Sequence, residues 1–170
     1  YQVRDAAGRE FTNNTIQVDF QQPDRFGLEY VADDGSRRRP VMIHRGAFGA
    51  MERMMAYLIE KYAGAFPTWL HPVQVVVIPI TDAQAEYAVQ VAARLRKARL
   101  RVEVDSRPER MNKKIREAQH QRVPYMAVLG AREVENGQVS VRNRAGEQSD
   151  EELGAFADRV ALEVAERRLN

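Results

Sequence analysis

Hydrophobic and polar residues alternate over short segments in the first third of the chain. Residues 15–20 (Thr-Ile-Gln-Val-Asp-Phe) place apolar side chains at every second position, as expected for a strand with one buried face. Residues 27–31 and 40–45 are further strand candidates, and the Asp-Asp-Gly-Ser sequence at 33–36 predicts a turn between them. Over residues 49–62 the apolar spacing changes to i, i+3, i+4, which predicts an amphipathic helix. These elements indicate an α+β unit with too few strands for a full core.

The rest of the chain has the pattern of alternating strands and helices. Residues 73–80 form a β-branched apolar run that is typical of a strand buried on both faces. Further elements follow in alternation: a helix from Thr81 to about Arg99, a strand at 102–104, a helix at 111–120 and a strand at 125–129. This alternation predicts an α/β domain.

The last part of the chain carries turn and capping signals. Asn136-Gly137 predicts a hairpin from Glu133 to Val141, because Asn-Gly favours the tight turns between antiparallel strands. Ser149 begins a sequence similar to a capping box, which predicts the start of the final helix. The complete order, β-α-β-α-β-β-β-α, predicts a mixed sheet covered by three helices.

Glycine and proline interrupt the pattern between these two parts, at Gly64, Pro67 and Pro72. These two residue types are the strongest breakers of helices and strands. We therefore interpret residues 1–66 as one unit and residues 72–170 as another.

The composition restricts the class of protein. The chain has 170 residues, 44% of them hydrophobic and 29% charged, with no cysteine. This balance excludes a disordered tail, a collagen-like repeat and a disulfide scaffold. No apolar run approaches the roughly 20 residues of a membrane span and no signal segment opens the chain, so we expect a cytoplasmic protein. Tyr1 leads directly into strand-like sequence, which indicates a piece of a longer protein.

Positive charge is concentrated in one segment. Residues 90–122 contain eleven basic and four acidic side chains, whereas residues 147–170 contain three basic and seven acidic ones. A basic zone in an otherwise balanced domain is expected where a protein contacts a phosphate backbone. A solvated, arginine-rich helix face is the alternative, since arginine outnumbers lysine 22 to 4 throughout the chain.

Two groups in the first unit are candidates for chemistry. His44 lies at the end of a predicted strand, but a chain with three histidines and no cysteine cannot assemble a complete structural zinc site from its favoured ligands. Gly46 and Gly49 precede a helix whose N-terminal amides suit an anion, with Arg53 one turn inside it. The alternatives are a strand-end histidine that satisfies its own hydrogen bonds and an exposed arginine in a salt bridge.

Five charged side chains of the second unit are candidates for nucleic-acid recognition. Side chains of this type read the base edges of single-stranded loops, and guanidinium planes stack on the bases. The candidates are Arg107, Arg116, Arg122, Glu133 and Arg142. Ordinary surface charge is the alternative for all five.

Residues 40–53, Pro-Val-Met-Ile-His-Arg-Gly-Ala-Phe-Gly-Ala-Met-Glu-Arg, closely resemble motif 3 of class II aminoacyl-tRNA synthetases in the form found in threonyl-tRNA synthetases. Residues 15–20 resemble a strand before that motif, and residues 62–70 resemble the linker that leads to the anticodon-binding domain. Residues 122–126 and 141–144 resemble later signatures of that domain. The motifs follow the family's order along essentially the whole chain.

The resemblance implies a domain organisation and an activity. Residues 1–66 would be the end of the catalytic domain, and residues 72–170 the anticodon-binding domain. The full-length protein would use ATP, with Mg²⁺, to activate threonine and would transfer it to threonine tRNA, as a homodimer. These 170 residues alone would be inactive, because motifs 1 and 2 lie outside them.

The resemblance also implies roles for individual residues. His44 matches one of three protein ligands of a Zn²⁺ ion that binds threonine through its amino and hydroxyl groups, with the other ligands upstream. A metal that coordinates the hydroxyl rejects valine, which an apolar pocket does poorly. Arg53 matches an arginine that contacts and orients ATP, and Gln17 matches a glutamine that lines the site. The five charged candidates of the second unit would bind the anticodon.

Departures from the family pattern leave alternatives open. The sequence Phe11 to Asn14 replaces a Trp/His-Gln-Cys type sequence, Ala50 replaces a common serine, and Pro108 replaces an asparagine. One alternative is a truncated, non-catalytic paralogue that acts as an RNA-binding module. Another is a related synthetase for proline, histidine or glycine, against which His44 argues.

Overall fold

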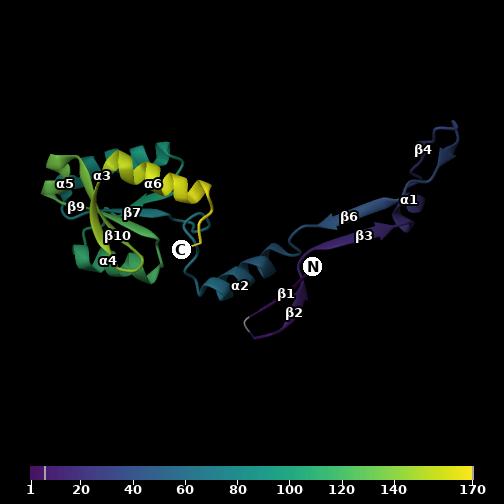
Figure 1. Ribbon diagram of the computed structural model, residues 1–170, viewed down its shortest axis with the longest axis horizontal. Helices are drawn as coiled ribbons and strands as arrows, with labels where there is room; N and C mark the ends of the chain where they lie inside the picture. The colour runs from purple at the N-terminus through teal and green to yellow at the C-terminus, as the bar shows by residue number, and fades with distance from the viewer. Residues whose placement is uncertain (6, 170) are drawn as a thin grey trace. The chain divides into compact units, whose positions relative to one another are not determined.

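The computed structural model describes residues 1–5 and 7–169. The chain forms two compact units, Tyr1–Ala63 and Gly64–Asn170. Figure 1 colours the first unit purple to blue and the second teal to yellow. Among the helices of the described ranges, none has the length and apolar character needed to cross a membrane.

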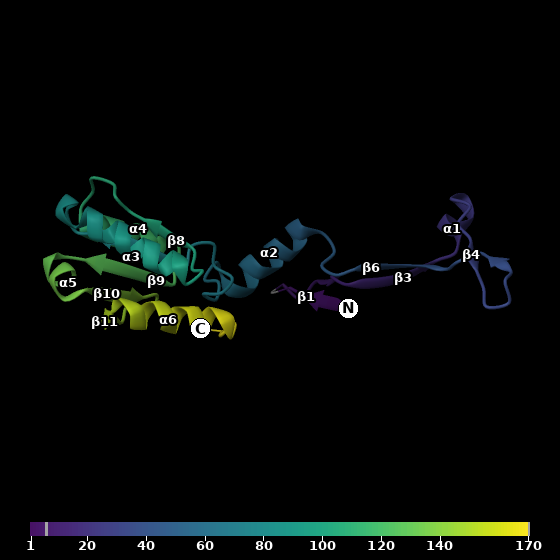
Figure 2. The same cartoon turned by 90° about the horizontal axis from the view of Figure 1, so that it is seen from above.

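The described residues of the first unit form three two-stranded antiparallel sheets. The strands are β1 (Gln2–Arg4), β2 (Glu10–Thr12), β3 (Thr15–Asp19), β4 (Tyr30–Val31), β5 (Arg37–Arg38) and β6 (Met42–Gly46). β1 pairs with β2, β3 with β6 and β4 with β5, and the β3–β6 ribbon can be followed along its length in Figure 2. The strands predicted at 15–20 and 40–45 are confirmed as β3 and β6.

Two helices complete the first unit. α1 (Gln21–Arg25) follows β3, and Asp19 accepts hydrogen bonds from two backbone N–H groups at its start. α2 (Met51–Tyr62) is the predicted amphipathic helix, and it ends where Ala63 adopts a left-handed conformation with φ 49°. No described residue of α2 is buried. An apolar helix face needs an opposing layer, and two-stranded sheets supply little of one.

A five-stranded mixed sheet forms the centre of the second unit, in the order β11-β10-β9-β7-β8. Its strands are β7 (Val75–Pro79), β8 (Val102–Val104), β9 (Tyr125–Leu129), β10 (Gln138–Asn143) and β11 (Gln148–Glu152). β7 is parallel to β8 and β9, whereas β10 is antiparallel to β9 and β11. The predicted α/β unit with a mixed sheet is confirmed.

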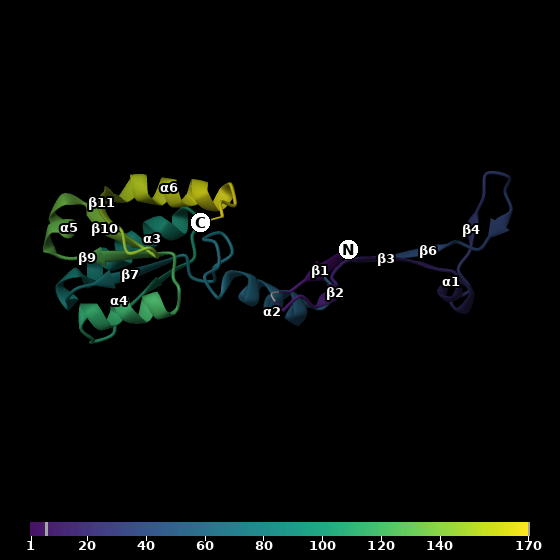
Figure 3. The same ribbon diagram turned by 60° about the horizontal axis from the view of Figure 1, so that its bottom comes forward.

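Helices cover both faces of this sheet. They are the 3-10 helix η1 (Asp82–Gln84) and the α-helices α3 (Ala85–Lys97), α4 (Met111–His120), α5 (Ala131–Asn136) and α6 (Leu153–Ala165). Figures 1 and 3 show α3 and α6 on one face and α4 on the other. The chain passes from β7 to β8 through α3 and returns past β7 to β9 through α4, and crossovers of the same hand in these two opposite directions put the helices on opposite faces.

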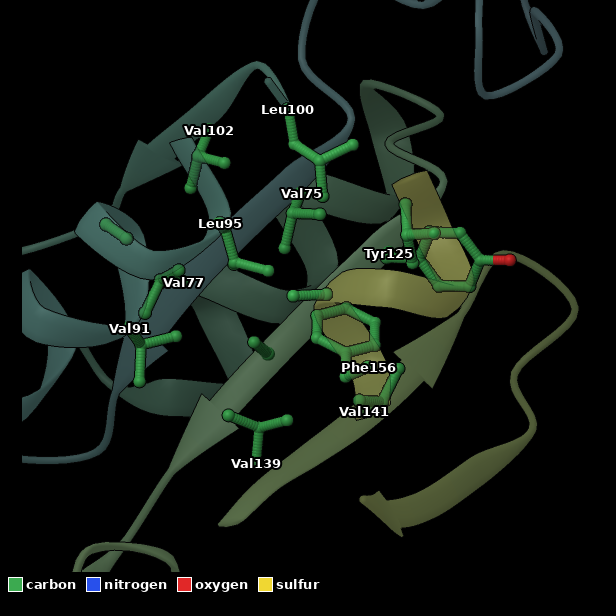
Figure 4. Packing of buried hydrophobic residues seen from close by; sticks show 14 of the residues in the cluster. Val75, Val77, Val91, Leu95, Leu100, Val102, Tyr125, Val139, Val141 and Phe156 are labelled. Carbon is green, nitrogen blue, oxygen red and sulfur yellow. The ribbon is translucent and has the colours of Figure 1, made fainter. Parts of the chain in front are cut away.

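The larger apolar cluster lies between the sheet, α3 and α6. Its members include Val75, Leu95 and Phe156, none of which is exposed to solvent, and Figure 4 shows them packed together. Tyr125 lies at the edge of this cluster and donates a 2.7 Å hydrogen bond from its hydroxyl to Glu163. Burial raises the pKa of Tyr125 to about 12. Each fully buried large apolar side chain contributes about 1.5–3 kcal/mol to folding.

A smaller cluster packs α4 onto the opposite face of the sheet. Ile115 of α4 contacts a group that includes Ile78 of β7 and Met126 of β9. Prolines apart, every buried apolar side chain in the described part of the chain falls within residues 75–160. The second unit therefore contains the hydrophobic core.

The hairpin predicted around Asn136-Gly137 is wrong. This dipeptide ends the short helix α5, where Gly137 has a φ of 66°. Left-handed backbone is needed both in a tight hairpin and at a helix C-terminus, so the Asn-Gly signal fits either structure. Glu133 stabilises the other end of α5, since its carboxylate accepts a 2.8 Å hydrogen bond from the Gly130 N–H.

The predicted start of the final helix at Ser149 is also wrong. Ser149 lies in β11, opposite Val141 of β10. α6 begins at Leu153, and Glu152 caps it by accepting a 2.8 Å hydrogen bond from the Ala155 N–H. An edge strand tolerates polar and charged residues because one side of it faces solvent, so the acidic sequence that suits a helix start also suits β11.

Candidate functional site

Three polar side chains share one face of the β3–β6 ribbon. The strand register pairs Gln17 with His44, and Asp19 follows two residues later on the same side. The Nε2 atom of His44 lies 3.0 Å from Oδ2 of Asp19. Ile16 and Ile43 belong to the opposite face, where they are exposed. The alternation of β3 and β6 thus separates a polar face from an apolar one.

Hydrogen bonds keep Asp19 ionised. The backbone N–H of Gln22 is the main cause that lowers the pKa of Asp19, and the hydrogen bond with His44 lowers it further. An ionised carboxylate beside Nε2 favours the tautomer of His44 that carries its proton there. Nδ1 is then the ring nitrogen with a lone pair available to coordinate a metal ion.

This pair bears on metal binding. Within residues 1–5 and 7–169, no three His, Cys, Asp or Glu side chains are grouped so that they could hold a metal ion. Metal-binding histidines usually donate their second ring N–H to a carboxylate or carbonyl, and the Nε2-protonated tautomer of His44 would donate to Asp19 in this way. The geometry of the two residues is compatible with one imidazole ligand and a supporting carboxylate, but the described residues do not supply the further ligands that a metal ion needs.

Arg53 lies in the first turn of α2. Its guanidinium carbon is 5.9 Å from the centre of the Phe11 ring, and Phe11 meets Tyr57 edge to face at 6.0 Å. The three side chains line a cavity of about 310 Å³ whose charged members include Asp5 and Glu60. A cation stacked on an aromatic ring is held in place while its edge stays available for hydrogen bonds.

Arg142 lies on β10, whereas Glu133 lies on α5, after the end of β9. Arg142 is paired with Gln148 across the strands, and its guanidinium donates a 3.1 Å hydrogen bond to Oε1 of Gln148. The Glu133 side chain is 11% exposed, because one of its oxygens caps α5. Arg132 lies 3.4 Å from Asp150 of β11 and 3.8 Å from Glu133.

Two other candidates are engaged in local contacts. Arg107 forms 2.6 Å ion pairs with both Asp105 and Glu117, and these carboxylates raise the pKa of its guanidinium. Arg116 is on the exposed side of α4 and donates a 3.4 Å hydrogen bond to His120. The charge of Arg107 is therefore largely compensated, whereas Arg116 has no carboxylate within ion-pair distance among the described residues.

Arg122 precedes β9 and has a left-handed backbone with φ 59°. Its side chain is exposed, and its carbonyl accepts a 3.0 Å hydrogen bond from Arg144. The guanidinium of Arg144 also donates hydrogen bonds to the carbonyls of Ala65 and Phe66, at 3.1 and 2.7 Å. Burial and the nearby Arg122 charge lower the pKa of Arg144.

The structure does not gather the five candidates into one cluster. Arg107 and Glu133 follow the carboxyl ends of β8 and β9, which lie at the same edge of the sheet because both strands are parallel to β7. Arg122 precedes β9 and lies toward the opposite edge, where β10 brings Arg142 alongside Met126. Arg116 is apart from both groups, on α4.

Sequence reasoning missed the residues that fix the segment before β7. His71 has a buried side chain that lies 3.3 Å from the Gln121 carbonyl, and burial lowers its pKa. Arg101 donates hydrogen bonds to the carbonyls of Trp69, His71 and Pro72. The only sequence signal was the density of aromatic and proline residues at 66–72, which is unusual for a flexible linker.

Two family models match the chain in sequence. The model described as the anticodon binding domain matches residues 74–163, which is more than half of the chain. The chain belongs to the anticodon-binding domain family. The model of the class II tRNA synthetase core domain (G, H, P, S and T) matches residues 2–62, upstream of this domain.

The relatives that match this chain in sequence include threonine–tRNA ligases. An enzyme of Thermus thermophilus is 52% identical over 98% of this chain, and that of Thermobifida fusca is 57% identical over 96%. The matches cover 26% and 24% of those proteins, so the chain spans about a quarter of their length. It corresponds to the end of the core domain and the anticodon-binding domain of a threonyl-tRNA synthetase, which confirms the resemblance drawn from motif 3.

A solved structure supports the same assignment. The RNA binding domain of threonyl-tRNA synthetase from Cryptosporidium parvum Iowa II matches with a TM-score of 0.82 and 37% sequence identity. The match covers 95% of this chain and 41% of that chain. The chain therefore shares both fold and sequence with a protein described as an RNA binding domain.

Proposed function

We propose that this chain is the part of a threonine–tRNA ligase that supplies motif 3 and recognises the anticodon of threonine tRNA. The observation that carries the proposal is the 52% identity to the Thermus thermophilus threonine–tRNA ligase over 98% of the chain, through both matched domains. We assign residues 1–66 to the end of the catalytic domain and residues 72–170 to the anticodon-binding domain.

The full-length protein would catalyse two successive reactions. The threonine carboxylate attacks the α-phosphate of ATP, which forms threonyl-adenylate and releases pyrophosphate, and the threonyl group then passes to a terminal ribose hydroxyl of the tRNA. Electrostatic stabilisation by Mg²⁺ and positioned cations suits this chemistry, because negative charge develops on phosphate oxygens. We expect the protein to act in the cytoplasm as a homodimer, as the family resemblance implies.

Arg53 and Gln17 are the residues of this chain proposed to bind ATP and substrate. The guanidinium of Arg53 lies over the Phe11 ring, which supports a role in contacting the nucleotide, since a cation–π contact leaves the N–H donors available. Gln17 shares a sheet face with His44, which supports its role beside the bound amino acid.

His44 is proposed as one ligand of a zinc ion, with further ligands outside this chain. When bound, zinc would supply a Lewis acid that coordinates the amino and hydroxyl groups of threonine. Asp19 would hold the imidazole so that Nδ1 is available, as its 3.0 Å contact with Nε2 supports. Replacing Asp19 with asparagine should weaken zinc binding about 10- to 100-fold in the full-length protein, measured by competition with a chelator.

Anticodon recognition is assigned to the second unit. We propose that Arg142, Arg122 and Glu133 contact bases, with Arg122 and Arg142 at one edge of the sheet and Glu133 at the opposite edge. Arg107 and Arg116 are proposed to bind the phosphate backbone. Arg116 is better suited to this, because the charge of Arg107 is largely compensated by its two ion pairs. The basic segment from 90 to 122 supports this electrostatic contribution.

Threonine-dependent exchange of pyrophosphate into ATP by the full-length protein tests this function. We expect exchange with threonine and much slower exchange with valine, which lacks the hydroxyl that zinc would coordinate. Arg53→Ala should reduce the rate by at least about 100-fold. Arg37→Ala, a control in an exposed salt bridge of the same unit, should leave it unchanged. Absence of exchange together with retained RNA binding would favour the non-catalytic module, for which the departures at Phe11 to Asn14 argue.

A further inference from the structure

A chain of hydrogen bonds runs across the open face of β10 and β11. Arg142 donates a 3.1 Å hydrogen bond to Oε1 of Gln148, and Nε2 of Gln148 donates a 3.0 Å hydrogen bond to Oγ of Ser140. Ser140 is buried, with 6% of its surface exposed, whereas Gln148 is exposed. These two hydrogen bonds thus connect the accessible guanidinium of Arg142 to the buried Ser140.

Strand register explains why these side chains meet. Gln148 lies directly opposite Arg142, and Ser140 lies two residues before Arg142, so all three share one face of the sheet. The amide orientation is set by its partners, because the reversed amide would place N–H donors against the guanidinium. Gln148 is therefore hydrogen-bonded at both of its polar atoms.

A long arginine side chain loses conformational freedom when it binds. Ordering it costs on the order of 1.5–2 kcal/mol, and a contact that orders it beforehand removes part of that cost from the binding step. Base recognition by arginine depends on a planar, bidentate approach to a base edge. A partner that fixes the plane of the guanidinium therefore changes selectivity more than it changes overall attraction to phosphate.

We propose that Gln148 is a positioning residue that holds the Arg142 guanidinium, through the Ser140–Gln148–Arg142 hydrogen bonds, for recognition of one anticodon base. The inference rests on the proposed role of Arg142 in anticodon binding. Gln148 acts on the RNA through Arg142, so its effect disappears when Arg142 is absent.

A double-mutant cycle tests the coupling. Binding of the full-length protein to threonine anticodon stem-loops with each of the four bases at one anticodon position is measured by fluorescence anisotropy for the wild type, Gln148→Ala, Arg142→Ala and the double variant. We expect Gln148→Ala to reduce selectivity at one position about three- to tenfold, and to add nothing in the Arg142→Ala background. Thermal unfolding of each variant checks that the fold is retained.

Two further variants separate positioning from charge and from general disturbance. Gln148→Glu keeps an acceptor for Arg142, so base selectivity should be retained while overall affinity falls and depends less steeply on salt. Gln90→Ala replaces an exposed glutamine of α3 and should leave both quantities unchanged.

The outcomes distinguish the inference from the function on which it rests. Loss of selectivity in Arg142→Ala with none in Gln148→Ala overturns the positioning role and leaves anticodon recognition intact. Additive effects of the two substitutions overturn it as well. If the wild type itself does not discriminate among the four bases at any anticodon position, the proposed anticodon recognition fails, and the inference fails with it.

Discussion

His71 is a buried residue whose protonation opposes folding. Its pKa is lowered from 6.5, mainly by burial, although carbonyl contacts partly offset the effect. Its ring nitrogens face two backbone carbonyls, with Nδ1 2.5 Å from that of Val73 and Nε2 3.3 Å from that of Gln121, and the neutral ring donates to one of them. The folded state therefore holds fewer protons than the unfolded state just below pH 6.5.

We expect the free energy of unfolding to fall as the pH decreases from above 6.5 toward the pKa of His71 in the folded state. His71→Asn should lower stability at neutral pH and flatten this dependence. Urea unfolding at several pH values, from about one unit above the ordinary histidine pKa to about one unit below it, measures both effects. If His71→Asn leaves the pH dependence of the free energy of unfolding unchanged, His71 is not its cause and another group titrates in this range.

Gly137 is the residue that decides between a helix end and a hairpin at Asn136-Gly137. Its φ of 66° is unfavourable for a residue with a Cβ, although no heavy atom lies within 4 Å of the position of that atom. Gly137→Ala should therefore cost about 1–2 kcal/mol from backbone strain alone. Gly137→Asn should cost less, since asparagine tolerates this conformation, and equal losses measured by urea unfolding would refute the explanation.

The segment before β7 is held by side chains from distant elements. Arg144 connects it to the loop that contains Arg122, through three hydrogen bonds to backbone carbonyls at 2.7 to 3.1 Å. Because one guanidinium serves three carbonyls from two separate segments, its removal leaves all three without this donor. Arg144 thus fixes residues 65–66 against the rest of the second unit.

Arg144→Ala should lower the free energy of unfolding by about 2 kcal/mol and increase hydrogen exchange in residues 64–72. Arg132→Ala is the matched control, because Arg132 is 77% exposed and its ion pairs lie at the surface. That control should change stability by less than about 0.5 kcal/mol. Unchanged hydrogen exchange in the segment after Arg144→Ala would show that other contacts, such as those of Arg101, hold it.

Elements with strong periodicity could be predicted from the sequence. The β-branched run at 73–80 predicts β7, because a strand buried on both faces is apolar at nearly every position. The helical spacing at 111–120 predicts α4, because a helix buried on one face repeats its apolar residues every three or four positions. The end of α5 and the start of α6 could not be predicted, since the same residues suit two local structures and strand pairing decides between them. His44 was found by its motif, whereas its partner Asp19 depends on the β3–β6 register.

The core of the molecule is confined to its second unit. Prolines apart, all buried apolar side chains in the described ranges fall within residues 75–160. We therefore expect residues 64–170, expressed alone, to unfold cooperatively with a midpoint within a few degrees of that of the 170-residue chain. Residues 1–63 alone should show no cooperative transition by circular dichroism, and a cooperative transition there would contradict this account.

Anticodon recognition is the central claim for the whole molecule, and binding to stem-loops tests it most directly. The affinities of the 170-residue chain for the anticodon stem-loops of threonine tRNA and of several other tRNAs would be measured at two salt concentrations. We predict binding to the threonine stem-loop that is at least about tenfold tighter than to the others at both salt concentrations, with the preference lost in Arg142→Ala. Equal affinity for every stem-loop, weakening in parallel as salt increases, would contradict the claim and reduce the basic segment to general attraction for phosphate.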